Sequence, residues 1–231
     1  MRPNANRAKL ATTFIWIVMG FQIISTISSF FQYLLLKSVA EGNTITPEAA
    51  NSNDLRQSII VILFAILYIF SVIFFIQWFR RAYFNQEVKF KTMASSNGWA
   101  SGAWFVPILN LFKPFQLMQE MYENAENYLL GKKLIDEKKS RKLIIGWWWG
   151  LWIATGVISR ASNSFENSSN SLDELIDSTV FSMFIILIFV PLSILTVKTI
   201  QNYNEMELIL EQESDEALHN KSNGDLLDAG I

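Results

Sequence analysis

The sequence predicts an all-α integral membrane protein: a four-helix bundle with a cytoplasmic re-entrant or interfacial segment and an amphipathic helix. Two observations predict this fold class. The apolar residues come in long runs without charge, and the charged residues are crowded between those runs. A segment that crosses a membrane must satisfy its own backbone hydrogen bonds, and these runs lack the alternation of barrel strands, so we expect them to be helices.

Four apolar runs are expected to cross the membrane, because a hydrocarbon core about 30 Å thick needs about 20 apolar residues in a helix. Residues 10–36 and 58–79 carry no charge. Residues 143–159 include four tryptophans and are short for a span, and residues 180–199 contain one charge, Lys198, near their end. We expect residues 1–212 to form a single membrane domain and residues 213–231 to be an acidic, disordered cytoplasmic tail.

The orientation follows from the Lys and Arg residues. With four spans, sixteen of the nineteen lie on the side that holds both termini and the segment 80–142. This excess predicts that both termini and the segment 80–142 are cytoplasmic. The apolar run 103–112 is too short to cross and, as a fifth span, would move the basic residues 132–142 outside. We therefore expect it to be an interfacial or re-entrant segment.

Helix signals lie between the spans. Thr46, Pro47 and Glu48 are typical of a helix start, and Ser171 with Glu174 has the spacing of a capping box. Pro114 is expected to begin an amphipathic helix that ends at Gly131. Its apolar face holds Met118, Met121, Tyr122, Ala125, Tyr128 and Leu129. Its polar face carries acids rather than lysines, which favours packing on the protein's own spans or on a partner over bare lipid.

Two groups of residues are candidates for membrane anchoring and helix packing. The candidate lipid-headgroup anchors are basic residues followed by indoles: Lys132, Lys133, Lys138, Lys139, Arg141, Lys142, Trp147 and Trp148. A specific lipid-headgroup site here is the alternative to simple anchoring. Small residues at four-residue spacing, Gly146, Gly150 and Ala154, are candidates for close helix packing.

A polar stripe follows the first span at helical spacing, made of Gln22, Ser25, Thr26, Ser29 and Tyr33. Such stripes usually face the interior of a bundle, where their side chains bond across helices. Two alternatives stay open for this stripe and for the small-residue stripe: a narrow polar pathway or an interface between two copies of the chain.

Two motifs resemble a known family. Residues 78–83 read WFRRAY at the end of the second span, and residues 104–116 read WFVPILNLFKPFQ, followed by Glu120. Together they resemble a bacterial membrane-protein family described as domain of unknown function 4328. The resemblance is strongest over residues 76–122. It implies a multispanning protein of the bacterial cytoplasmic membrane, and it implies no catalytic residue.

The same motifs supply a candidate cytoplasmic binding site: Arg80, Arg81, Asn110 and Glu120. The arginines emerge at headgroup level, and the Asn110 amide needs hydrogen-bond partners between apolar neighbours, so these residues could form an anion or ligand site. The alternative is that the arginines only anchor the span and that Asn110 stabilises a turn.

The chemistry that is absent narrows the function. The chain has no cysteine and one histidine, and the four runs contain no Asp, Glu, His or Arg. Pumps and coupled transporters normally place ionisable groups there. We expect no enzyme activity, catalytic residue, cofactor or metal. We expect a protein that binds, as a scaffold, regulator or accessory subunit, with a small uncoupled channel or transporter as the alternative. The expected partners are the lipid bilayer and either another protein or a second copy. Nucleic acid is not expected at a net charge of −2.

Overall fold

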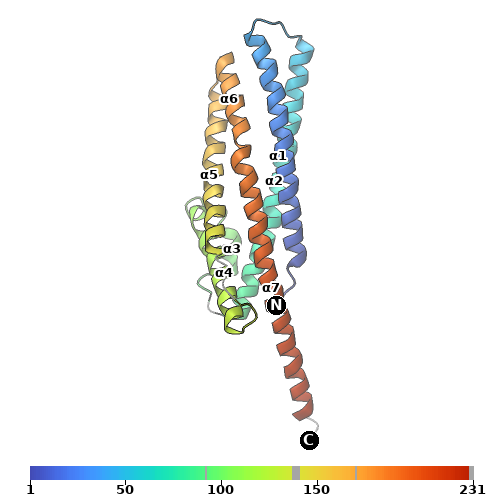
Figure 1. The fold of residues 1–231 in the computed structure, drawn as a ribbon, viewed down its shortest axis with the longest axis vertical. Coiled ribbons are helices and arrows are strands. Elements are labelled where there is room, and N and C mark those ends of the chain that lie inside the picture. The colour runs from blue at the N-terminus through green and yellow to red at the C-terminus, as the bar shows by residue number, and fades with distance from the viewer. Residues whose placement is uncertain (92, 137–140, 170, 229–231) are drawn as a thin grey trace. The chain divides into compact units, whose positions relative to one another are not determined.

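The computed structural model describes residues 1–91, 93–136, 141–169 and 171–228, and within these ranges every regular element is helical. In chain order they are α1 (Ala5–Ala40), α2 (Pro47–Phe90), α3 (Asn97–Gly102), the 3-10 helix η1 (Leu109–Leu111), α4 (Lys113–Gly131), α5 (Arg141–Ser168), α6 (Leu172–Phe184) and α7 (Ile186–Asp228) (Figure 1). The all-α prediction is confirmed. The division at residue 212 into a domain and a tail stays a prediction, and α7 runs through it.

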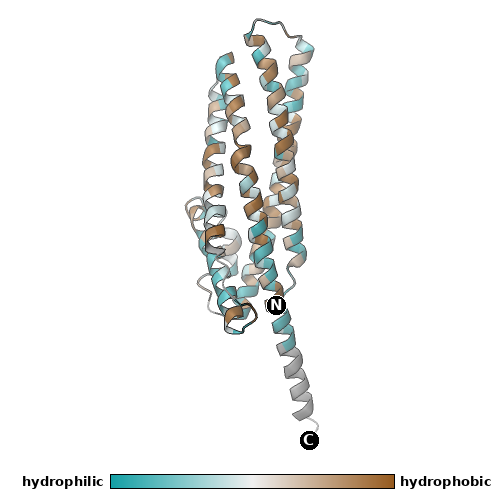
Figure 2. Cartoon of the chain, in the orientation of Figure 1, coloured by the Kyte–Doolittle hydropathy of each residue, from teal (hydrophilic) through white to brown (hydrophobic). Residues whose placement is uncertain are grey.

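Three helices are long and apolar enough to cross a membrane: Ala5–Ala40, Pro47–Phe90 and Leu172–Glu216, the last combining α6 with most of α7. They contain the predicted runs 10–36, 58–79 and 180–199, and their apolar stretches are visible in Figure 2. The predicted run 143–159 is helical within α5. Its four tryptophans have a polar N–H each, so its mean hydropathy is lower than that of an aliphatic span.

The helix ends follow the predicted signals with one exception. The Thr46 hydroxyl accepts from the Ala49 N–H at 3.2 Å, and Ser171 with Glu174 forms a complete capping box. The predicted end of α4 at Gly131 is confirmed, but this glycine does not take the left-handed conformation of a helix cap. The residue with positive φ is Lys133, at 56°, and its N–H donates to the Leu130 carbonyl oxygen at 2.9 Å. The Leu134 N–H donates to the Leu129 carbonyl oxygen. Together these two bonds form a Schellman motif in which Lys133 takes the place that glycine usually has.

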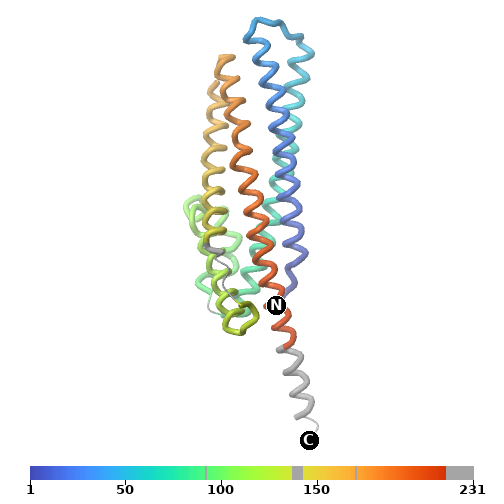
Figure 3. The backbone as a smooth tube through the Cα atoms, in the orientation of Figure 1, coloured from blue at the N-terminus to red at the C-terminus, as the bar shows by residue number. Residues whose placement is uncertain are grey.

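Contacts divide the chain into two compact units. Unit 1 holds Met1–Thr12, Phe74–Gly146 and Lys198–Ile231, and unit 2 holds Thr13–Ile73 and Trp147–Val197. Each unit is built from segments that are distant in sequence, as the colours of the backbone trace show in Figure 3. Long helices such as α1 and α2 contribute one part to each unit.

In unit 2, α1 and α2 lie side by side. Phe14 and Phe70 approach with ring centroids 6.0 Å apart, and Arg56 Nε donates to Ser28 Oγ at 3.0 Å. The outward faces of these helices are lined with exposed Ile, Leu, Phe and Val side chains, as a lipid-facing surface requires. Ser28 lies eight residues before the end of the run 10–36, so the Arg56 guanidinium binds α1 well inside that predicted run.

In unit 1, α4 packs on α7 and on the last turns of α2. Its buried side chains include Leu117, Met118, Met121, Tyr122, Ala125 and Leu129, which confirms the predicted apolar face. The Tyr122 hydroxyl donates to the Thr199 carbonyl oxygen inside the unit, and the Tyr122 and Tyr203 rings lie 5.5 Å apart. The amphipathic helix is therefore docked on the chain's own helix.

Candidate functional site

A buried carboxyl group lies at the centre of unit 1. Glu207 is on α7 and only 3% exposed. Its Oε2 accepts from Asn4 Nδ2 at 2.9 Å, and its Oε1 accepts from Asn85 Nδ2 at 2.6 Å. Three distant parts of the chain thus meet at one side chain: the segment before α1, the end of α2 and the second half of α7.

Burial determines the protonation of this carboxyl. Glu207 lies eight residues beyond the apolar run 180–199, outside the expected span. Burial raises the pKa of the Glu207 carboxyl to about 7, against the opposing effect of the hydrogen bonds from Asn85 and Asn4. The charge of Glu211 raises this pKa further, and that of Arg81 lowers it. A carboxyl with this pKa exchanges a proton near neutral pH.

Polar and aromatic side chains surround Glu207. Gln86 Nε2 donates to the Tyr203 hydroxyl at 2.8 Å, and the Tyr203 ring meets the Trp78 ring edge to face at 6.1 Å. Buried atoms of unit 1 that have no hydrogen-bond partner among the described residues include Asn4 Oδ1, Trp78 Nε1, Gln86 Oε1 and Thr199 Oγ1. Such atoms can bind a small polar molecule or exchange partners when the carboxyl changes its proton.

One further carboxylate joins elements of unit 1. Glu213 on α7 forms a salt bridge with Lys89 of α2 and accepts from the Tyr128 hydroxyl of α4 at 2.8 Å. Lys132 lies 3.7 Å from the same carboxylate. The acids of the second half of α7 therefore include two, Glu207 and Glu213, that hold the unit together instead of facing solvent.

The four predicted binding residues have different surroundings. Arg81 interacts with the charges of Arg2, Arg7 and Arg80. Glu120 accepts from the Tyr83 hydroxyl at 2.8 Å and from the Ala94 N–H at 2.6 Å.

Asn110 lies in η1, and its Oδ1 is buried without a partner among the described residues. A single site made of Arg80, Arg81, Asn110 and Glu120 stays a prediction.

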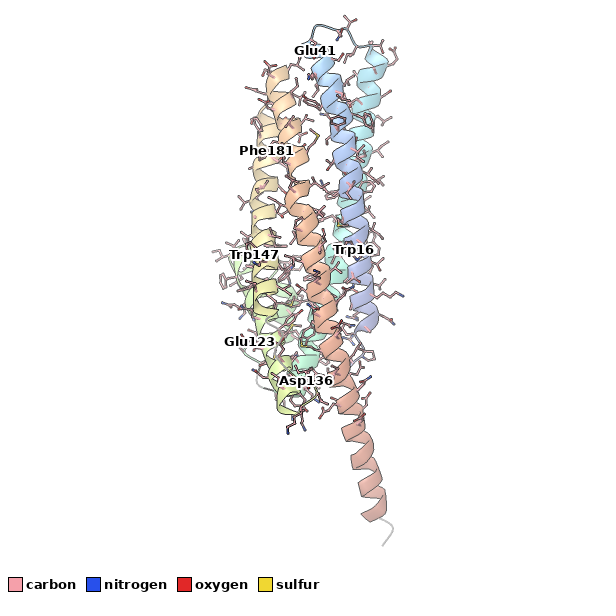
Figure 4. All side chains as sticks on the ribbon, viewed as in Figure 1. Trp16, Glu41, Glu123, Asp136, Trp147 and Phe181 are labelled. Atoms are coloured by element: carbon pink, nitrogen blue, oxygen red, sulfur yellow. The ribbon has the colours of Figure 1, made fainter. Side chains whose placement is uncertain are left out.

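The predicted lipid anchors divide into exposed and buried residues. Lys132 and Lys133 are exposed, and so is Trp147 at 62% (labelled in Figure 4). Trp148 is only 1% exposed and its Nε1 donates to Thr196 Oγ1 at 3.1 Å, so its indole packs inside unit 2, contrary to the predicted headgroup contact. The prediction for four other anchors lies outside what the structure describes: residues Lys138 and Lys139, and the side chains of Arg141 and Lys142.

Two members of the small-residue stripe have open space beside them among the described residues. A Cβ atom added to Gly146 or to Gly150 would meet no atom within 4 Å, and both glycines are exposed. Ala154 is half-buried. Helix packing through this stripe stays a prediction.

Glu207 is not among the candidate site residues predicted from the sequence. A signal was present. Ile200, Tyr203, Glu207 and Leu210 recur at intervals of three and four residues, so Glu207 belongs to the apolar face of its helix, and all four side chains are buried. A buried acid on an apolar face needs hydrogen-bond partners. The sequence did not identify Asn4 and Asn85 as those partners.

Comparison with known proteins identifies the family of this chain and nothing further. Neither the curated proteins nor the solved structures contain a match to this chain. Residues 41–205 match the family described as Domain of unknown function (DUF4328), and they include both motifs that suggested it. Because the match covers most of the 231 residues, the chain belongs to this family, DUF4328.

Proposed function

We propose that the protein crosses the bacterial cytoplasmic membrane four times, keeps both termini in the cytoplasm and acts by binding, as a scaffold, regulator or accessory subunit without enzymatic activity. Three passes are supported by α1, α2 and the helix Leu172–Glu216. α5 is the fourth, because the run 143–159 is helical and free of charge. With four passes, sixteen of nineteen basic residues face the cytoplasm.

The observation that carries the binding proposal is an exposed apolar surface on unit 1. Its members are large apolar side chains between residues 99 and 112, here called the apolar strip: Trp99, Phe105, Val106, Ile108, Leu111 and Phe112. Phe105 and Ile108 are each 73% exposed. An exposed apolar patch of this kind marks a surface that binds a protein or enters the membrane interface.

The neighbouring helix favours a protein partner over lipid alone. α4 begins directly after the apolar strip and is fixed on α7 by Tyr122, so the strip is joined at its C-terminal end to a helix docked on unit 1. The polar side of α4 includes Glu123 and the exposed Gln116 and Asn127. A helix that rests on anionic lipid usually presents Lys and Arg there.

Photo-crosslinking in cells tests this proposal. A photoreactive phenylalanine is placed at Phe105 or Ile108, and a matched control is placed at Val88, which is 49% exposed on α2 in the same unit. We expect adducts of one discrete protein mass from the strip positions and none from Val88. Adducts with phospholipid alone at Phe105 and Ile108 would contradict a protein-binding strip and leave it as an interfacial segment.

The alternative, a small uncoupled channel or transporter, rests on the polar stripe of α1. The Ser25 and Thr26 hydroxyls donate to the Phe21 and Gln22 carbonyl oxygens one turn earlier, at 3.1 and 3.0 Å. These bonds lie within the helix and need no water, which supports packing over a wet pathway. Solute flux in liposomes that disappears in Gln22→Leu would reverse this preference.

A further inference from the structure

Four arginines come together in unit 1. Arg2 and Arg7 belong to the start of the chain, and Arg80 and Arg81 follow the apolar run of α2. Burial lowers the pKa of the Arg81 guanidinium, and the positive charges of Arg7, Arg2 and Arg80 lower it further. The charges of Arg2, Arg7 and Arg80 therefore all act on the Arg81 guanidinium.

The positions of Arg2 and Arg7 beside the last turns of α2 are fixed by contacts. The Arg2 N–H donates to Asn85 Oδ1 and the Arg2 carbonyl oxygen accepts from Asn85 Nδ2, both at 2.9 Å. The Arg2 guanidinium lies over the Phe84 ring, 4.7 Å from its centroid. Arg7 Nη1 donates to the Gln77 carbonyl oxygen at 3.1 Å. A cluster held in this way loses little freedom when it binds a ligand.

The four arginines form no ion pair with a carboxylate among the described residues. The ion pairs there are those of Lys89 and Lys132 with Glu213, so none of the four arginines has a carboxylate within ion-pair distance. The charge of Glu207 acts on Arg81 and raises the pKa of its guanidinium, and the two Glu207 oxygens already accept from Asn4 and Asn85. An anion bound between the arginines would relieve their repulsion.

We propose that Arg2, Arg7, Arg80 and Arg81 form a binding site for a phosphate group, the chemistry shared by the headgroup of an anionic phospholipid and a soluble phosphate. Guanidinium groups bind phosphate oxygens in pairs, through parallel N–H donors. Arg7 precedes the run 10–36 by three residues and Arg80 directly follows the run 58–79. These positions are at headgroup level, so a lipid is the first source to test. This site does not depend on the proposed partner of the apolar strip.

The experiment uses the full chain purified from membranes. Native mass spectrometry measures the retained anionic phospholipid, and calorimetry measures inorganic phosphate binding to protein exchanged into a neutral detergent. The cluster variant is Arg2→Gln/Arg81→Gln. The control variant, Lys91→Gln/Lys113→Gln, makes the same change in charge elsewhere in unit 1. Arg80→Gln alone, at an exposed position, serves if the double variant fails to fold.

We expect the cluster variant to bind about ten- to a hundredfold more weakly for each arginine removed, and the control to match the native protein. Loss of retained phospholipid assigns the site to a headgroup, and loss of inorganic phosphate binding with unchanged lipid assigns it to a soluble phosphate. Arg2→Lys/Arg81→Lys should also weaken binding, since lysine keeps the charge but not the paired donors. Equal retention of lipid and equal phosphate binding by native, cluster and control proteins would overturn the proposal.

Discussion

Asn4 and Glu207 are 203 residues apart in sequence and are joined by a hydrogen bond of 2.9 Å in the interior of unit 1. Glu207 accepts a second bond from Asn85, whose amide also binds both backbone groups of Arg2. One carboxyl thus holds the start of the chain against α2 and α7. The arginine cluster depends on this arrangement, because Asn85 fixes the position of Arg2.

Glu207→Ala should destabilise the protein by about 2–4 kcal/mol, because it leaves two buried amides without their acceptor. The measurement is thermal unfolding in detergent. Glu205→Ala is the matched control on the same helix, and because Glu205 is exposed it should change stability by less than about 0.5 kcal/mol. Equal unfolding temperatures for the two variants would show that the carboxyl contributes nothing to the fold.

The stability of the protein should also fall as pH rises from about 4.5 to about 7. The folded-state pKa of Glu207 is raised to about 7 from 4.5, so the folded state binds the proton more tightly in this window. The contribution is fully present below about 4.5, is lost as pH rises through 7, and amounts to about 3 kcal/mol at most.

Glu207→Gln is the variant that checks this pH dependence. It replaces the carboxyl by a group that stays neutral, and a flipped Asn4 amide could offer its Oδ1 to the new donor. The difference between the native and variant curves of stability against pH separates the contribution of Glu207, including the effects of Arg81 and Glu211 on its pKa, from that of the other titrating groups. If stability changed with pH by the same slope in the native protein and in Glu207→Gln, the pH dependence would not come from Glu207.

Tyr122→Phe should cost about 1 kcal/mol, because it removes the hydroxyl that binds the Thr199 carbonyl oxygen and leaves the ring in place. Hydrogen exchange of the α4 backbone amides measures this loss of stability directly, because docking of α4 on α7 protects those amides from exchange. Tyr68→Phe, at a ring that is 45% exposed on α2, should leave exchange in α4 unchanged. Unaltered α4 protection in Tyr122→Phe would mean that the helix is held by apolar contacts alone.

The adjacent tryptophans of α5 should respond differently to the same change. Trp148→Phe removes the buried bond to Thr196 and should lower stability by about 1–2 kcal/mol, whereas Trp147→Phe, at an exposed ring, should have little effect. Comparable unfolding temperatures for the two variants would contradict the buried position of Trp148.

These contacts explain which features the sequence could predict. The apolar face of α4 and the capping box at Ser171 follow from intervals of three and four residues, which depend only on local helix geometry. Trp147 and Trp148 are neighbouring residues of the same type. Successive residues on a helix point about 100° apart, so the packing of α5 decides which of the two is buried.

The buried site could not be predicted in the same way. The partners of Glu207 lie 203 and 122 residues away in sequence, so no local pattern joins them. The helical spacing of Glu207 with Tyr203 and Leu210 indicates that Glu207 is buried. That spacing does not indicate that Asn4 and Asn85 are its hydrogen-bond partners. Likewise, the sequence placed Arg80 and Arg81 at a membrane boundary without identifying Arg2 and Arg7 as their neighbours.

Cysteine accessibility tests the central claim, the four-pass topology, most directly. The chain has no cysteine, so single substitutions give a clean background. Ser52→Cys and Ser168→Cys should react with an impermeant thiol reagent in intact cells. Ser96→Cys, Lys133→Cys and Gln212→Cys are exposed in unit 1 and should react only after the membrane is opened. Labelling of Lys133→Cys in intact cells would place the segment 80–142 outside and contradict the topology and the cytoplasmic binding surface together.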